Sequence, residues 1–149
     1  MSLRLRHNVA LMTALELSQP TVTDDGRAFE LLDKEREGLP FSAVREVIER
    51  YGFSDQEAAT LLGVDLRTFQ RYREKAARLK PARSTALLAP LQVLRYGEVV
   101  FGAPAKLKRW LRRENAALGG HRPLALLHLS TGRGLVRDVL TRIEFGVFG

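Results

Sequence analysis

Residues 58–72 read AATLLGVDLRTFQRY, and two short apolar-rich segments lie on either side of Gly63 in this stretch. Glycine readily takes the left-handed backbone conformation that a tight turn between two helices requires. Ala59, four residues earlier, is small enough to lie where the two helices cross. Apolar residues at the offsets expected for packing between the helices are Ala58, Leu62, Val64, Phe69 and Tyr72. The spacing therefore predicts a helix-turn-helix.

The opposite side of the second helix carries polar and basic side chains. Arg67, Gln70 and Arg71 lie in its N-terminal turns, which in a helix-turn-helix enter the major groove of DNA. Arginine suits the edge of guanine and glutamine the edge of adenine, so these three residues are the expected base readers. Phosphate contacts are expected from Thr68, Arg73, Lys75 and Arg78. Two helices joined by a glycine are also a common way to pack a small all-α domain.

The distribution of charge favours the DNA-binding interpretation. The chain has 149 residues and a formal net charge of +7. Residues 64–83 hold seven basic and two acidic side chains, and residues 104–122 hold six basic and one acidic. Such segments favour a polyanionic partner, because each neutralised phosphate releases condensed counterions. A solvated face that keeps the protein soluble is the alternative.

Helical periodicity continues through the rest of the chain, without the sustained alternation typical of strands. An N-terminal arm is expected at 1–27. In the first half of the chain, helices are then expected at 28–37, from the N-cap Ser42 to Tyr51, from the N-cap Ser54 to Leu62, and from the N-cap Asp65 to Leu79, with Pro81 as a stop. In the second half, helices are expected from Ser84 to Phe101, from Pro104 onward, over 123–129, and from an N-cap at Ser130 or Thr131 onward. Inward positions include Leu66, Ala76, Val99 or Val100, Leu135, Val139, Leu140 and Ile143. We therefore expect an all-α protein with a helix-turn-helix DNA-binding domain at 28–83 and a small helical domain at 84–149.

The residue inventory excludes several classes of chemistry. No cysteine is present, so disulfides and thiolate catalysis are excluded. The three histidines are His7, His121 and His128, and no third ligand lies near the last two in sequence, so no metal site is expected. The sequence shows neither a carboxylate pair suited to acid–base catalysis nor a Ser-His-Asp arrangement, so neither an enzyme nor a cofactor is expected. Without a membrane span or a signal peptide, the chain is expected to be cytoplasmic.

Three parts of the sequence together resemble the Xre/MbcA/ParS antitoxins. The first is Gly38-Leu39-Pro40, and the second is the helix-turn-helix with its Arg67-Thr68-Phe69-Gln70-Arg71 segment. The third and most specific part runs from Val100 to Phe148. Its cues are Phe101-Gly102, Trp110-Leu111, the pattern from Asn115 to Leu127 with Gly119-Gly120 and Pro123-Leu124, and Arg142-Ile143-Glu144-x-Gly146-Val147-Phe148. The resemblance covers about residues 38–148.

This resemblance implies an antitoxin of a type II toxin–antitoxin system. The C-terminal domain would neutralise a RES-domain toxin, which degrades NAD or uses it for ADP-ribosyl transfer, by covering its NAD site. The helix-turn-helix would bind operator DNA in its own promoter as a homodimer. The residues that the resemblance places against the toxin are Arg142, Glu144, Phe145, Val147, Phe148 and Gly149, with Trp110 and Leu111 supporting the domain.

Two questions stay open at the level of sequence. The chain could instead be a stand-alone dimeric repressor whose C-terminal half only dimerises. In that case the aromatic C-terminal segment would pack on its own domain or on a second copy. The basic segment 104–122 could extend the DNA contact or face an acidic surface of the toxin.

Overall fold

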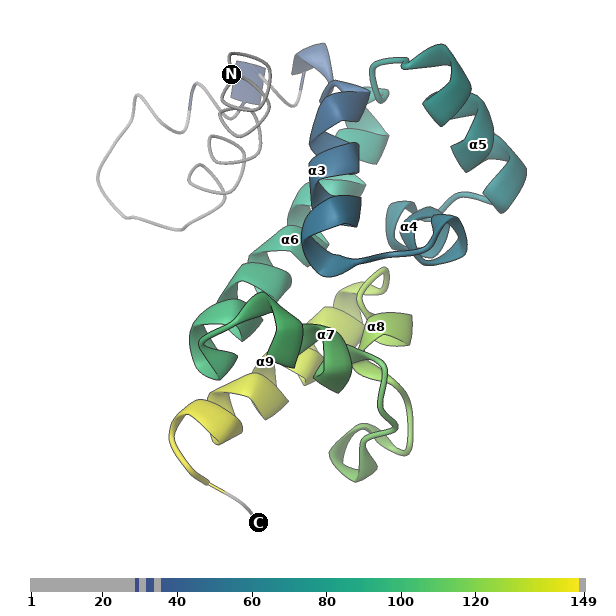
Figure 1. Cartoon of the computed structure of the whole chain (residues 1–149). Helices are drawn as coiled ribbons and strands as arrows, with labels where there is room; N and C mark the ends of the chain where they lie inside the picture. Colours follow the sequence, from purple (N-terminus) through teal and green to yellow (C-terminus); the bar gives the residue numbers. More distant parts are fainter. Residues whose placement is uncertain (1–28, 30–31, 34–35, 148–149) are drawn as a thin grey trace, which may run out of the picture. The chain divides into compact units, whose positions relative to one another are not determined.

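The computed structural model describes residue 29, residues 32–33 and residues 36–147. Within this part of the chain all regular elements are helices, which confirms the all-α prediction (Figure 1). They are α3 (Phe41–Tyr51), α4 (Asp55–Leu62), α5 (Leu66–Lys75), α6 (Pro81–Phe101), α7 (Pro104–Leu111), the 3-10 turn η1 (Ala116–Leu118), α8 (Pro123–Leu126) and α9 (Ser130–Glu144). The expected arm at 1–27 lies outside the described residues, as do residues 28, 30–31 and 34–35 of the expected helix at 28–37, and Phe148 and Gly149.

The chain divides into two compact units, and the boundary lies within α6, between Gln92 and Val93. This boundary lies later in the chain than the expected one between residues 83 and 84. Each unit has an apolar core of its own. The largest fully buried side chains of the N-terminal unit are Val44, Tyr51, Leu62, Phe69, Leu79, Leu87 and Leu91, and those of the C-terminal unit are Leu94, Leu107, Leu111, Leu127 and Leu140. Over the described residues, no helix combines the length and the apolar character that crossing a membrane requires.

Helix α3 begins one residue after Pro40, which is extended and occupies the N-cap position. The prediction of Ser42 as the N-cap is therefore wrong, since Ser42 lies inside the first turn. The start moves earlier because Phe41 is buried, with its ring centroid 5.9 Å from that of Phe69. Packing between helices thus outweighs the local capping preference of serine.

The segment before α3 is hydrogen-bonded to the segment that follows α5 and to the first turn of α6. The backbone N–H of Leu79 donates to the carbonyl of Leu39 at 2.9 Å, and the N–H of Leu39 donates to the buried hydroxyl of Ser84 at 2.8 Å. A β-carbon at Gly38 would lie 2.0 Å from the carbonyl oxygen of Leu79, so only glycine fits there. This pairing draws Leu79 out of the helix that the sequence pattern predicted for it.

Helix α5 consequently ends at Lys75, and Ala76 adopts a left-handed conformation with φ of 44°. The prediction of Ala76 as an inward residue is wrong, because its side chain is exposed. The expectation that Pro81 ends a helix is also wrong. Pro81 is instead the first residue of α6, a position where its missing N–H costs no helical hydrogen bond.

The structure decides between two alternatives for an inward residue in α6 and corrects one prediction of an inward residue in α9. Of Val99 and Val100, the structure leaves Val99 69% exposed and Val100 half-buried. In α9, Leu135 is 48% exposed and Val136 is fully buried in its place. No side chain caps α9, whose N-cap is Leu129, so neither Ser130 nor Thr131 has the predicted role.

The rotation of α9 follows from a close approach to the end of α8. A β-carbon at Gly132 would lie 2.2 Å from the carbonyl oxygen of Leu126, so the backbones meet directly at this point. Val136 and Leu140 follow Gly132 at four-residue steps and therefore share its buried face. Leu135 points away from this face, which explains its exposure.

Candidate functional site

The helix-turn-helix forms as the sequence predicts. Ala59 of α4 is fully buried in the core of the N-terminal unit, where α4 packs against α5. Gly63 ends α4 with φ of 65°. The backbone N–H of Gly63 donates to the carbonyl of Thr60, and that of Val64 donates to the carbonyl of Ala59, both at 3.0 Å. These two bonds satisfy the last carbonyls of α4 and set the turn.

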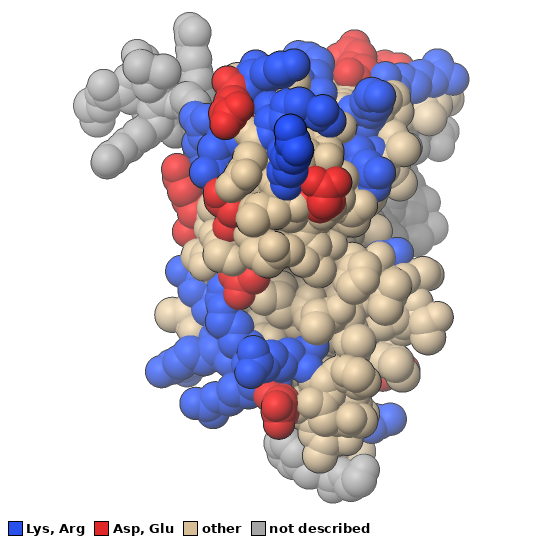
Figure 2. All heavy atoms as spheres, turned by 90° about the vertical axis from the view of Figure 1, so that its right-hand side faces the viewer, with Lys and Arg blue, Asp and Glu red and all other residues tan. Residues whose placement is uncertain are grey.

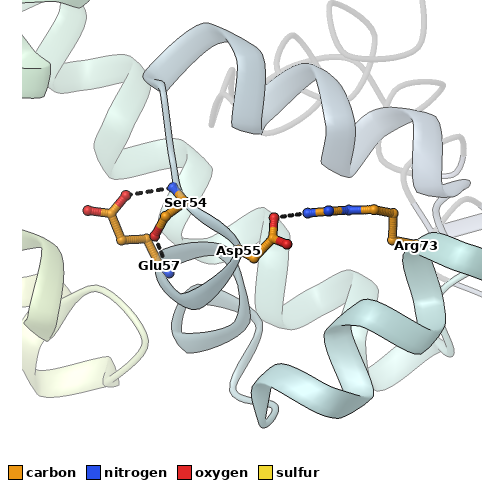
Figure 3. A network of polar contacts seen from close by, with 4 residues as sticks. All are labelled: Ser54, Asp55, Glu57 and Arg73. Atoms are coloured by element: carbon orange, nitrogen blue, oxygen red, sulfur yellow. Dashed lines mark hydrogen bonds and ion pairs between the residues drawn. The ribbon is translucent and has the colours of Figure 1, made fainter.

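Figure 3 shows the polar contacts that fix the start of α4 and link it to α5. Ser54 and Glu57 form the expected capping box, with hydrogen bonds of 2.8 and 3.1 Å between side chain and backbone. Asp55 forms an ion pair with Arg73 of α5, and the guanidinium of Arg73 also lies over the ring of Phe69, 5.4 Å from its centroid. Arg73 therefore holds α5 against α4. A contact of Arg73 with phosphate, which stays a prediction, would compete with Asp55.

Asp65 caps α5, as the sequence predicts. Its carboxylate accepts hydrogen bonds from the backbone N–H of Thr68 at 2.8 Å and from the Thr68 hydroxyl at 2.9 Å. These two bonds, the backbone one first, lower the pKa of Asp65 below its ordinary value. Because the hydroxyl proton of Thr68 is already donated to Asp65, the predicted donation from Thr68 to a phosphate would require this bond to break.

The outward face of α5 presents the predicted base readers to solvent. Arg67, Gln70 and Arg71 are exposed, and Lys75 follows on the last turn. Figure 2 shows Lys and Arg side chains gathered over this helix. No ion pair or hydrogen bond occupies these four side chains within the part of the chain that the structure describes. The face offers donors in the pattern that major-groove contacts use.

Two arginines have structural roles that the sequence does not reveal. Arg83 of α6 donates to the carbonyls of Leu62 and Gly63, at 3.3 and 3.1 Å, and so braces the turn of the helix-turn-helix. Arg78, expected at the DNA backbone, donates to the carbonyl of Gly38 at 2.8 Å. Both partners lie 20 or more residues away in sequence, so no local pattern could have identified these contacts.

In the C-terminal unit, the last turn of α9 is anchored to α6. The hydroxyl of Tyr96 donates to the carboxylate of Glu144 and lies 3.2 Å from the hydroxyl oxygen of Thr141. The guanidinium of Arg137 covers the Tyr96 ring, 5.4 Å from its centroid. The hydrogen bond to Glu144 raises the pKa of Tyr96 above its ordinary value of 10.0, because ionised tyrosine would face a carboxylate.

The chain leaves α9 in a defined direction. Gly146 has φ of 65° and donates its N–H to the carbonyl of Ile143, while the N–H of Val147 donates to the carbonyl of Arg142 at 2.8 Å. This pair of bonds is the Schellman arrangement that ends many helices. Phe145 and Val147 are 72% and 59% exposed beside the exposed Arg142 and Glu144.

Trp110 and Leu111 lie in the body of the C-terminal unit. Leu111 is 1% exposed, and Trp110 is half-buried with its ring centroid 5.5 Å from that of Phe101. Both therefore stabilise the unit. His121 and His128 are exposed, and the described residues contain no cluster of three potential metal ligands.

Comparison with protein families identifies both units. Residues 30–89 match the family described as the antitoxin Xre-like helix-turn-helix domain. Residues 97–146 match the family described as the antitoxin Xre/MbcA/ParS C-terminal toxin-binding domain. The first match lies within the N-terminal unit and the second within the C-terminal unit. No curated protein matches the chain.

Proposed function

Because the chain belongs to the Xre/MbcA/ParS antitoxins, we propose that it neutralises a RES-type toxin and represses its own promoter. The matched domains are those of a type II antitoxin, one for DNA and one for a toxin. The toxin is an enzyme that consumes NAD, and the antitoxin covers its NAD site. The antitoxin itself supplies no catalytic group.

The observation that carries this proposal is the exposed end of α9. Phe145 and Val147 expose most of their apolar surface to solvent at the end of the toxin-binding domain. Apolar anchors flanked by charged groups are the usual composition of a binding hot spot. Arg142 and Glu144 supply the charged groups. The end of α9 is therefore suited to enter a concave site and exclude a small-molecule substrate.

The geometry of this end also favours affinity. The bonds of Gly146 and Val147 to α9, together with the anchoring of Glu144 by Tyr96, hold the chain direction before any partner binds. Less conformational entropy is then lost when the toxin binds, so the same contacts give a higher affinity. Phe148 and Gly149, the last two residues that the resemblance assigns to the toxin contact, stay predictions.

Repression of the promoter is supported by α5. Arg67, Gln70 and Arg71 on its exposed face read the operator, and Lys75 contacts the phosphate backbone. We propose that the chain binds as a homodimer, because helix-turn-helix proteins recognise paired half-sites with two copies of the reading helix.

The test is to express the chain together with the product of its adjacent gene. A stable complex in which NAD consumption ceases, and recovery of NAD consumption when residues 142–149 are deleted, would establish the proposal. DNA binding by the deleted chain should persist. Absence of any complex, with salt-sensitive binding to its own promoter, would instead establish a stand-alone repressor.

A further inference from the structure

We infer that the C-terminal unit carries a second DNA-contacting surface, which binds the phosphodiester backbone of the DNA fragment held by the helix-turn-helix. This surface consists of Lys106 and Arg109 on α7 together with Arg113 and Arg122 in the loops that follow. We call it the α7 basic surface. The inference rests on the proposal that the N-terminal unit binds operator DNA.

The side chains of the α7 basic surface are exposed, with one carboxylate, that of the exposed Glu114, next to them in sequence. Lys106 and Arg109 are three residues apart on the outer side of α7, opposite the buried Leu107 and Leu111. None of the four cations is paired with a carboxylate among the residues that the structure describes. Figure 2 shows Lys and Arg side chains gathered on the C-terminal unit, in the lower part of the view. Such a surface attracts a polyanion because neutralising phosphates releases their counterions.

Helix stability accounts for only one of the four cations, Arg109. Cations in the last turn of a helix interact favourably with its dipole, which accounts for Lys108 and Arg109. Arg112 has a structural role as well, since it donates to the carbonyl of Lys108 at 3.0 Å. Lys106, however, is the third residue of α7, where the dipole disfavours a positive charge and where no acidic side chain offsets it.

The composition of the surface favours DNA over a protein partner. Protein interfaces centre on apolar or aromatic anchors and are depleted of charge at their core. None of the large apolar side chains exposed in the described part of the chain falls between residues 104 and 122. Those of the C-terminal unit are Val99, Leu129, Leu135, Phe145 and Val147. Residues 104–122 thus carry exposed cations without exposed large apolar anchors, a composition suited to phosphates.

The unit holds the α7 basic surface in place. Leu107 and Leu111 anchor α7 in the core. The loop after α7 is closed at Asn115, whose side chain accepts from the N–H of Ala117 at 2.9 Å and whose backbone N–H donates to the carbonyl of His121 at 3.1 Å. Because the backbone is already ordered, no backbone conformational entropy has to be lost when these cations bind phosphates.

The experiment measures the affinity of the full chain for a duplex containing its own promoter over a range of KCl concentrations. The variant carries Lys106→Gln, Arg109→Gln and Arg113→Gln. Each phosphate contact contributes about 0.9 to the magnitude of the slope of log affinity against log salt, so this magnitude should fall by about 2 to 3 for each protomer bound. Affinity for a scrambled duplex should fall by the same factor, because backbone contacts do not read sequence.

The matched control carries Lys106→Arg, Arg109→Lys and Arg113→Lys, which keep the charge and should keep the slope. An unchanged slope in a folded glutamine variant would overturn the inference while leaving the operator proposal intact. Weakened binding to the toxin with an unchanged slope would likewise overturn it and assign the surface to an acidic face of the toxin. Failure of the unmodified chain to bind promoter DNA would overturn the operator proposal and this inference together.

Discussion

Tyr96 of α6 donates a hydrogen bond to the carboxylate of Glu144, 48 residues later in the chain, where α9 ends. This bond ties the exposed end of the toxin-binding domain to the body of its unit. Glu144 is thereby both a residue proposed to face the toxin and a residue whose position is set by a neighbouring helix. If Glu144 faces the toxin as proposed, the affinity for the toxin depends on Tyr96, a side chain that need not touch the toxin.

Replacing Tyr96 by phenylalanine should therefore weaken toxin binding. The loss of one hydrogen bond corresponds to about 1 kcal/mol, or about fivefold in the dissociation constant. Calorimetric titration of the toxin with the purified variant measures this change. Tyr72→Phe in the N-terminal unit is the matched control and should leave toxin binding unchanged. Equal affinities for the Tyr96→Phe variant and the unmodified chain would show that the bond does not position the end of α9.

Substitutions on α5 should separate base contacts from phosphate contacts. Arg71→Ala should weaken operator binding by about 1 to 3 kcal/mol and relax the preference at one base pair, because a bidentate contact to a base is lost. Lys75→Gln should weaken the binding of operator and unrelated DNA equally, with the magnitude of the salt slope lower by about 0.9 for each protomer bound. Fluorescence anisotropy on both duplexes measures these effects. Arg45→Gln on α3 is the control. A uniform loss for both α5 variants would argue against base reading by Arg71.

The cap of α5 should make the stability of the N-terminal unit depend on pH. The hydrogen bonds from Thr68 lower the pKa of Asp65 in the folded state, so its contribution to the free energy of unfolding is present above the unfolded pKa. That contribution is lost as the pH falls from about 4 through the folded pKa. Asp65→Asn keeps a capping oxygen but removes the charge.

This variant should be less stable than the unmodified chain at neutral pH. The difference should shrink as the pH falls below the ordinary aspartate pKa of about 4 and Asp65 takes up its proton. Urea unfolding followed by circular dichroism at several pH values measures the difference. A stability gap that stays constant across this range would contradict the role of the charged cap.

Two glycines of α9 offer a paired test of the packing of the C-terminal unit. Gly132→Ala should destabilise the unit by about 1 to 3 kcal/mol, because its β-carbon would meet the carbonyl oxygen of Leu126. Gly134→Ala should stabilise it by about 0.5 to 1 kcal/mol, since no atom lies within 4 Å of a β-carbon there and alanine favours helix. Thermal unfolding of both variants measures the two effects. Equal changes in the two variants would exclude the close approach at Gly132.

Features set by neighbours in sequence could be predicted, and features set by distant contacts could not. The helix-turn-helix follows from Ala59 and Gly63, and the caps at Ser54 and Asp65 follow from the three-residue spacing to their partners. The end of α5 could not be predicted, because it depends on the pairing of Leu79 with Leu39. The burial of Val136 in place of Leu135 could not be predicted either, because the rotation of α9 is set by the close approach of Gly132 to the backbone of Leu126.

The same division holds for the candidate sites. The exposed positions of Arg67, Gln70 and Arg71 follow from helical periodicity. The ion pair between Arg73 and Asp55 depends on how α5 packs against α4, so the number of charges in the sequence could not predict it. The exposure of Phe145 and Val147 could not be predicted either, because the sequence does not show whether this apolar segment packs on its own domain or stays exposed for a partner.

The most direct test of the antitoxin account is the rate of NAD consumption by the purified product of the adjacent gene. It is measured with the unmodified chain and with a Phe145→Ala, Val147→Ala variant. Both side chains are largely exposed, so the variant should fold and bind promoter DNA normally. We predict that the unmodified chain stops NAD consumption and that the variant leaves most of it intact at the same concentration. Full inhibition by the variant, or no inhibition by the unmodified chain, would contradict the account.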